Sequence, residues 1–530
     1  MHMVRGTQVI NGTEYVYEYD STWNAEKKYG THKRNYIGKM VNGVFVPNKK
    51  YKLQMELEQA KKRGPVAVTA SKRLFYGATY LFDAIGEKLG ITTDLKKCFP
   101  EKYTQLLSVA YYLILEDRNP LSRFPKWART HVHPFGDNIA SQRSSELFGL
   151  VGENAKQQFF KLQLERRLED EYLAYDTTSI SSYSKLLGQV KYGRNKNHEH
   201  LPQINLALIY GQDSRLPVGY RKLPGNISDV TTIKKLLFDL EYLATKKVKL
   251  VMDRGFYSED NINALYQHHY KFLIAAKISL KIVQNELNKV RELMLTRPHY
   301  SSKHQLSYYT KMITWPFQEV KKRTDSVVLS EKRLYLHLFH NGQRAVDDKA
   351  LLNALLDQLE EELLTGKPDP AHEKLYSKYF VVKETPARGV KLTPKQDAIN
   401  AAEKNYGYFA LLSNDIKDPL EALHVYRSKD IIEKAFGNLK ERLNLRRTSV
   451  SSEENLEGKL FVQFVALIYL AYIDKKMHDC NLYRDYTLQG LLDELDVIER
   501  FEHPGHQPQS GEVTKKQSEL YQLLGVNAPA

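Results

Sequence analysis

Between residues 172 and 276, hydrophobic and polar positions follow a pattern that is typical of strands interleaved with helices. Strands are predicted for five segments: 172–179, 204–210, 217–223, 248–253 and 272–276. Amphipathic helices are predicted after the third strand, to about residue 244, and over residues 260–269. The fourth strand is almost continuously apolar, which is typical of a central strand covered on both faces. This order of elements predicts an α/β layer with a mixed sheet.

The regions outside this layer have other patterns. Residues 8–48 alternate Tyr, Val and Ile with polar residues and predict a β-hairpin, with a further turn at Asn42-Gly43. Residues 49–65 have the composition of a charged connector, and residues 71–150 predict several short helices broken at glycines and prolines. The apolar run 460–473 predicts a buried helix, because it is too short to span a bilayer.

We expect six parts along the chain: 1–65, a basic β-hairpin and connector; 66–150, a helical DNA-binding domain; 151–277, the first part of the α/β core; 278–412, a β-rich insertion; 413–480, the second part of the core; and 481–530, a C-terminal helical tail. Within the insertion, strands are predicted at 308–315, 334–340, 379–382 and 406–412. A helical segment is predicted at 347–364.

Charge and cysteine content narrow the class of partner and compartment. The 530 residues have a formal net charge of +15, so a polyanionic partner is expected, although ribosomal and membrane-surface proteins are also basic. The two cysteines, Cys98 and Cys480, have no flanking ligands, which excludes a disulfide scaffold and a zinc finger and is typical of a reducing cytoplasm. Residues 1–12 lack an apolar run, so no secretory signal is expected.

Two acids lie on the predicted strands. Asp176 is in the middle of the first strand, and Asp253 ends the apolar fourth strand, at the edge where ligands gather in such sheets. A buried acid is costly unless it is neutralised, and carboxylates without clustered Cys or His favour Mg²⁺ or Mn²⁺. By itself Asp176 also fits a structural acid. The pair His198 and His200 matches no common metal-site spacing and is interpreted as part of a basic loop.

The stretch from Tyr426 to Arg447 is predicted to be one helix. Its apolar arc consists of Ile432, Phe436, Leu439 and Leu443. A neighbouring arc holds polar and small residues: Tyr426, Lys429, Glu433, Gly437, Lys440 and Asn444. An acid at the edge of a core is accessible to a metal, and lysines suit phosphate. The alternative is an ordinary amphipathic surface helix with Glu/Lys pairs.

Together these motifs resemble those of the DDE transposases of bacterial insertion sequences. Asp176-Thr-Thr and Val251-Met-Asp253-Arg-Gly-Phe256 resemble the first two acidic motifs. The third resembles the branch named after insertion sequence four, with its spacing Tyr-x2-Arg-x3-Glu-x6-Lys. Tyr426, Glu433 and Lys440 match it in register, whereas Lys429 stands at the arginine position and loses bidentate phosphate geometry.

The resemblance implies an RNase H-like mixed sheet flanked by helices and interrupted by the β-rich insertion. It implies a catalytic and metal-binding triad of Asp176, Asp253 and Glu433, with two Mg²⁺ ions for which Mn²⁺ can substitute. The activity implied is cutting of insertion-sequence ends and transfer of the 3′-OH to target DNA, in a cut-and-paste reaction that can pass through a hairpin. The implied partners are the terminal inverted repeats, target DNA and a second copy of the chain, in the bacterial cytoplasm and at the nucleoid.

The expected DNA contacts come from three places: Tyr426, Lys429 and Lys440 on the third motif; Arg254 beside the second; and Lys191, Arg194 and Lys196 in the basic loop. Trp315 in the insertion is a candidate for stacking on a base pulled from the helix, and the alternative is a core tryptophan.

Two other functions remain open from the sequence. One is an RNase H-like nuclease such as a junction resolvase, although such enzymes are usually much smaller. The other is a transposase-derived DNA-binding protein without catalysis, against which the intact triad argues. Inverted repeats bordering the reading frame would separate these functions from a transposase.

Overall fold

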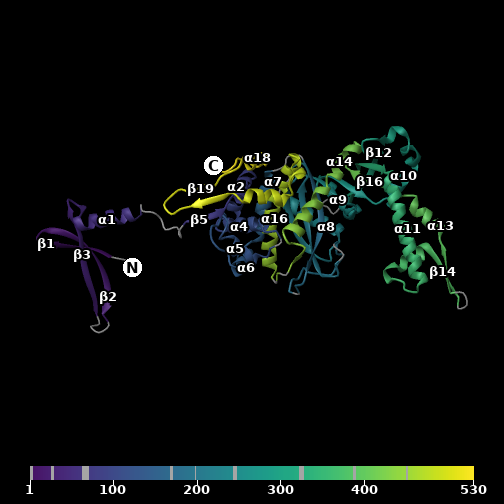
Figure 1. Ribbon diagram of the computed structural model, residues 1–530. Coiled ribbons are helices and arrows are strands. Elements are labelled where there is room, and N and C mark those ends of the chain that lie inside the picture. Colours follow the sequence, from purple (N-terminus) through teal and green to yellow (C-terminus); the bar gives the residue numbers. More distant parts are fainter. Residues whose placement is uncertain are drawn as a thin grey trace. The chain divides into compact units, whose positions relative to one another are not determined.

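The computed structural model describes residues 4–24, 29–62, 71–117, 119–166, 171–184, 186–196, 199–242, 248–320, 327–385, 389–448, 450 and 452–530 (Figure 1). The chain divides into two compact units. The first comprises Met1–Phe75, Ile498–Glu512 and Ala530, and the second comprises Tyr76–Val497 and Val513–Pro529.

The first unit contains the predicted N-terminal hairpin as part of a four-stranded antiparallel sheet. Its strands are β1 (Val4–Ile10), β2 (Thr13–Asn24), β3 (Tyr29–Val41) and β4 (Val44–Pro47), paired in that order. The predicted turn at Asn42-Gly43 is confirmed, and Asn11-Gly12 makes a second one. Both residues of each turn have positive φ, between 49° and 77°, which is the backbone that an Asn-Gly hairpin turn requires.

The rest of the first unit consists of a helix and a small sheet. The expected charged connector is largely helical, as α1 (Lys49–Lys62). A three-stranded sheet joins β5 (Lys72–Phe75) to β18 (Glu499–Glu502) and β19 (Gln509–Ser510), so two segments more than 400 residues apart pair with each other.

The second unit is built on the predicted mixed sheet. β6 (Tyr172–Ser182), β7 (Gln203–Gly211) and β8 (Pro217–Pro224) form an antiparallel meander. β9 (Lys249–Met252) pairs in parallel with β6, and β10 (Lys271–Ala276) in parallel with β9. The helices α8 (Asp229–Tyr242) and α9 (Glu259–Gln267) make the two crossovers. The order β10-β9-β6-β7-β8 is the expected RNase H-like arrangement.

The residues between β10 and the third motif extend this sheet. After α10 (Lys281–Met294) and β11 (Tyr300–Ser301) comes the long hairpin of β12 (Leu306–Val320) and β13 (Val327–His340). β16 (Tyr408–Ser413) pairs antiparallel with both β10 and β13. The central sheet therefore continues from the RNase H-like strands into this hairpin without a break.

A small cluster with its own core lies between β13 and β16 in the chain. It comprises α11 (Gly342–Leu364), which includes the predicted helix 347–364, then α12 (Glu373–Tyr379), β14 (Phe380–Thr385), β15 (Gly389–Pro394) and α13 (Gln396–Glu403). Its core consists of six buried residues: Leu352, Leu359, Tyr376, Tyr379, Phe380 and Ile399. The segment is therefore mixed, with helices as well as strands.

A helical layer covers the β8 side of the sheet. Its main members are α2 (Gly77–Lys88), α3 (Ile91–Cys98), α4 (Tyr103–Leu115), α5 (Phe124–Trp127), α6 (Ser141–Gly149), α7 (Glu153–Glu165), α16 (Glu453–Asp479), α17 (Leu488–Asp496) and α18 (Lys515–Leu523). α16 is its centre, because its aromatic side chains contact both the sheet and the other helices. The ring centroid of Phe464 lies 5.3 Å from that of Tyr220 in β8, and the ring centroid of Tyr469 lies 5.6 Å from that of Tyr111 in α4.

The helix α16 contains the apolar run 460–473 that was predicted to be buried. It is long and apolar enough to cross a bilayer, but 89% of its most apolar window is buried inside the protein. No other helix among the described residues meets the same length and hydropathy criteria. The prediction of a buried core helix is confirmed.

The prediction of one continuous helix through the third motif is wrong. α14 (Pro419–Arg427) ends at a turn formed by Ser428 and Lys429, and α15 (Asp430–Gly437) begins after it. The side chain of Gln212 donates to the carbonyl of Val425 at 2.9 Å, and the Lys429 N–H bonds to Tyr426 instead, at 3.2 Å. In a continuous helix the Lys429 N–H would bond to the Val425 carbonyl. Because the Gln212 side chain bonds to this carbonyl instead, the helix is interrupted.

The second half of that motif follows the predicted pattern more closely. α15 continues into a π-helical turn, η6 (Asn438–Arg442), after which β17 (Arg447–Thr448) pairs in parallel with β6. The predicted apolar arc is buried: Ile432, Phe436, Leu439 and Leu443. A π-turn inside a helix is common at functional sites.

Candidate active site

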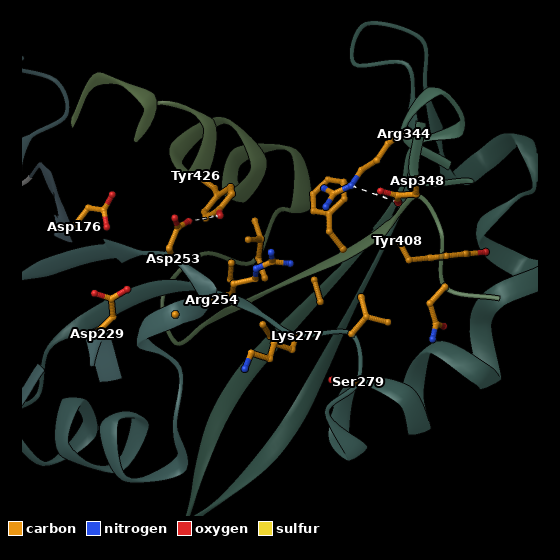
Figure 2. Close-up of a pocket in the computed structure, with 18 of the residues that line it drawn as sticks. Asp176, Asp229, Asp253, Arg254, Lys277, Ser279, Arg344, Asp348, Tyr408 and Tyr426 are labelled. Carbon is orange, nitrogen blue, oxygen red and sulfur yellow. Dashed lines mark hydrogen bonds and ion pairs between the residues drawn. The ribbon is translucent and has the colours of Figure 1, made fainter. Parts of the chain in front are cut away.

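The register of the central sheet brings the two strand acids together. β6 and β9 run in parallel, with Tyr172 opposite Lys249 and Tyr175 opposite Met252. The residue that follows each of these two paired segments is an acid: Asp176 after Tyr175, and Asp253 after Met252. Both acids line a cleft of about 1080 Å³, in which Figure 2 shows them on the same wall.

The carboxylate of Asp176 is largely buried, with 13% of the side chain exposed. It accepts a hydrogen bond from the N–H of Thr177 at 2.7 Å, and the ammonium group of Lys196 lies 3.6 Å away. Burial raises the pKa of Asp176, the nearby charge of Asp253 raises it further, and Lys196 and the Thr177 N–H oppose this. The site therefore favours additional positive charge at Asp176.

Asp253 is held by two residues of the third motif. The hydroxyl of Tyr426 donates to Asp253 Oδ1 at 2.6 Å, and Lys429 Nζ lies 3.2 Å from the same oxygen. Lys429 is 3% exposed. Burial works to lower the pKa of Lys429, but the carboxylates of Asp253 and Asp176 outweigh it and the pKa is raised. Burial, followed by the charge of Asp253, raises the pKa of Tyr426 well above its usual range, so its hydroxyl keeps its proton.

Glu433 lies on the other side of Lys429. Its Oε1 is 3.7 Å from Lys429 Nζ, and 64% of the side chain is exposed. Lys429 thus contacts both Asp253 and Glu433, while the three triad acids do not converge directly. Within the described part of the chain, no three His, Cys, Asp or Glu side chains are arranged closely enough to hold a metal ion.

Of the remaining candidates, Arg254, Arg194 and Lys196 line the cleft, whereas Lys440 and Lys191 are not among its described lining residues. Arg254 is exposed and lines the cleft. Lys440 is half-buried; burial lowers its pKa to about 8, and the charges of Lys196 and Arg446 contribute. Lys191 and Arg194 are exposed on a loop whose Gly193 crosses so close to the turn after β8 that an added Cβ would lie 2.1 Å from a carbonyl oxygen of that turn.

Lys196 is exposed, but its ammonium group is directed to β6 and lines the cleft. Its ammonium group donates to the carbonyl and to the hydroxyl of Thr177, each at 2.7 Å. The neighbouring His198 lies outside the described residues. Glu199 pairs with Arg447 at 3.0 Å and accepts a hydrogen bond from the Ser181 hydroxyl, so an ion pair connects the loop to β17 and a hydrogen bond connects it to β6.

Trp315 is placed as a core residue. It is 4% exposed, and its indole N–H donates to Asn263 of α9 at 2.8 Å. A base cannot stack on a ring that is covered in this way. The structure therefore favours the core alternative over the DNA contact that was considered for Trp315.

The structure adds residues that the sequence did not single out. The far wall of the cleft carries Arg344 and Tyr408 (Figure 2). Phe409 also lines the cleft, and the Arg344 guanidinium lies 5.4 Å from the centroid of its ring. The near wall carries a third aspartate, Asp229, in the first turn of α8. An acid in the first turn of a helix is an ordinary pattern, so nothing in the sequence marked Asp229 as part of the site.

The residues that line the cleft lie within a segment that matches a known family. A family model described as "Transposase DDE domain" matches residues 168–469, which is more than half of the chain. A solved structure, described as "Cryo-EM structure of piggyBac transposase synaptic complex with hairpin DNA", is 12% identical with a TM-score of 0.31, over 74% of this chain and 67% of that one. No curated protein matches the sequence. From the family match, the chain belongs to the transposase DDE domain family.

Proposed function

We propose that this protein is a transposase that cuts the ends of an insertion sequence and joins the resulting 3′-OH to target DNA. The observation that supports this best is the position of Asp176 and Asp253. They lie side by side, at the positions that follow the last paired residues of the parallel strands β6 and β9, in a cleft within the matched transposase domain. Two adjacent carboxylates at such a strand edge are the arrangement that divalent-metal phosphoryl transfer requires.

The residues of the cleft fit a hard divalent ion. The donors are carboxylate oxygens, and the burial of Asp176 makes an additional cation favourable. Asp176, Asp253 and Glu433 would hold Mg²⁺, for which Mn²⁺ can substitute. The exposed side chain of Glu433 has room for other rotamers. When bound, the metal ions would activate a water or 3′-hydroxyl and stabilise the leaving oxygen of an in-line displacement.

The chain's own residues orient the acids and hold the DNA. Tyr426 fixes the carboxylate of Asp253 by donating its hydroxyl proton, and Lys429 compensates its charge from beneath. Arg254 is exposed at the mouth of the cleft, where its fork of N–H groups suits a phosphate of the cut strand. Lys440 serves a second phosphate.

Arg194 lines the cleft, and Lys191, exposed on the same loop, extends the positive surface beyond it. In the proposal, two copies of the chain act together on two DNA ends in the bacterial nucleoid. Cleavage of the second strand at each end can pass through a hairpin, which forms when the 3′-OH attacks the opposite strand. Both features can be observed in the assay that tests the function, because a paired complex and a hairpin product migrate differently from free ends.

The test uses duplex DNA from the sequence that borders the reading frame in its genome, with Mg²⁺ and the full chain. Single variants Asp176→Asn, Asp253→Asn and Glu433→Gln should each lose cleavage by at least about 100-fold while retaining DNA binding. The matched control is Glu454→Gln, an exposed acid in the first turn of α16, which should cut at the wild-type rate.

Each outcome separates the candidate functions. If one of the three variants cuts near the wild-type rate, the residue that it replaces is not part of the catalytic triad. If the wild-type chain binds the ends but never cuts them, it is a non-catalytic DNA-binding protein. Cleavage of any duplex without joining of ends indicates an RNase H-like nuclease.

A further inference from the structure

Lys196 shares its charge between two carboxylates. Two of its ammonium protons go to Thr177, to the carbonyl and the hydroxyl oxygen, at 2.7 Å each. The ammonium nitrogen also lies 3.6 Å from Asp176 Oδ1 and 3.5 Å from Asp229 Oδ2. Both distances exceed the 2.7–2.9 Å of a direct charge-assisted hydrogen bond. Lys196 is therefore held near Asp176 without being bonded to it.

Asp229 accounts for this intermediate position. Its Oδ1 accepts the hydroxyl proton of Thr177 at 2.5 Å, which turns a lone pair of that hydroxyl toward Lys196. Its Oδ2 attracts the ammonium group directly. The backbone following Asp253 also packs against this side chain, since a Cβ at Gly255 would lie 3.2 Å from Asp229 Oδ2. Figure 2 shows Asp229 on the same wall as Asp176 and Asp253.

We propose that Asp229 is a positioning residue that draws Lys196 away from Asp176 and so keeps Asp176 accessible to a divalent cation. This inference rests on the proposed function, because it assumes that Asp176 holds a metal ion. Without the charge of Asp229, Lys196 has Asp176 as its one carboxylate partner in the described residues and closes to bonding distance. A cation must then compete with a tight ion pair.

The test measures Mn²⁺ binding to the full-length, DNA-free protein, by the electron paramagnetic resonance signal of free Mn²⁺. Asp229→Asn should weaken Mn²⁺ binding by about ten-fold, the lower end of the loss typical for outer-shell partners of a metal site. Lys196→Gln removes the competing cation and should bind Mn²⁺ at least as tightly as the wild type. The double variant should return to within about two-fold of Lys196→Gln, because the two residues act through each other.

The double variant separates positioning from direct ligation and from folding. If it stays as weak as Asp229→Asn, Asp229 is itself a ligand and the proposal is overturned. It is also overturned if Asp229→Asn has no effect, or if Lys196→Gln alone weakens Mn²⁺ binding. A structural defect would lower the melting temperature of Asp229→Asn without rescue by Lys196→Gln. Should Asp229→Asn not fold, the Lys196→Gln result decides.

Asp253→Asn serves as the reference for the proposed function. If Mn²⁺ binding is weaker in this variant but unchanged in Asp229→Asn, the metal site remains in place and only the role of Asp229 is removed. Unchanged binding in Asp253→Asn would instead contradict the metal site itself.

Discussion

Lys429 is buried next to Asp253, although helical spacing predicted only that it lies on an arc beside the apolar face of the third motif. Its neighbours come from β9 and from α15, so its environment depends on contacts between segments far apart in the chain. A lysine is a compact point charge that can lie between two carboxylates, where the planar fork of an arginine fits less well. Its expected role as a DNA contact stays a prediction, and its burial supports a role in orienting Asp253.

Lys440 allows a prediction for the pH dependence of DNA binding. Its pKa in the free protein is lowered to about 8, so it is largely charged at pH 7 and largely neutral at pH 9. A phosphate favours the charged form, so DNA affinity at constant salt should fall as the pH rises through 8, by about three- to ten-fold.

The matched control for this measurement is Lys440→Arg, which stays charged throughout the range. Fluorescence anisotropy at pH 7, 8 and 9 gives the affinities. Parallel curves for the wild type and Lys440→Arg would show that Lys440 does not contact DNA phosphate.

At the scale of elements, the hydrophobic pattern predicted the central strands well. The five strands of the core occur within three residues of their predicted ends, because buried strands require apolar runs that few other elements share. The break between α14 and α15 was missed. It depends on Gln212, more than 200 residues away, whose side chain takes the carbonyl of Val425.

Gly458 of α16 permits a stability test of the helical layer. A Cβ at this position would lie 2.2 Å from the carbonyl oxygen of Phe148 in α6, a backbone atom that cannot turn away. Gly458→Ala should lower the free energy of unfolding by about 1–3 kcal/mol through overpacking, although alanine is the better helix former. The melting temperature in calorimetry measures the effect.

Gly149→Ala is the control on the facing helix. Its added Cβ would have its nearest neighbour at 3.6 Å, which is ordinary contact, so a change within about 0.5 kcal/mol is expected. Equal losses in both variants would mean that the close approach of α16 to α6 is not what limits stability.

For the molecule as a whole, the motifs predicted that Asp176 and Asp253 lie together, but not that Asp229 joins them in the cleft. Asp176 lies within β6 and Asp253 follows β9, and the parallel pairing of these two strands brings both acids to one edge. The residues of the opposite wall of the cleft could not be predicted from the sequence. Arg344 and Phe409 come from α11 and β16, and their position depends on the pairing of β16 with β10, a long-range contact that no local pattern indicates.

The net charge of +15 leads to a prediction for the intact chain. If binding depends mainly on phosphate contacts spread over the N-terminal 150 residues and the loop 191–196, the logarithm of DNA affinity should fall linearly with the logarithm of salt concentration. A slope of about −4 or steeper is expected between 50 and 300 mM KCl, since each phosphate contact contributes about −0.9.

The exposed loop residues test where those contacts lie. The double variant Lys191→Glu with Arg194→Glu should reduce the steepness of the slope by about 2, one unit for each lost contact. The control is Lys367→Glu with Lys374→Glu, which changes the net charge by the same amount at exposed positions outside the cleft. Lys196 is left unchanged because it bonds to Thr177 inside the site. Equal losses in both variants would indicate attraction by net charge alone, and a flat salt dependence of the wild type would contradict phosphate-dominated binding.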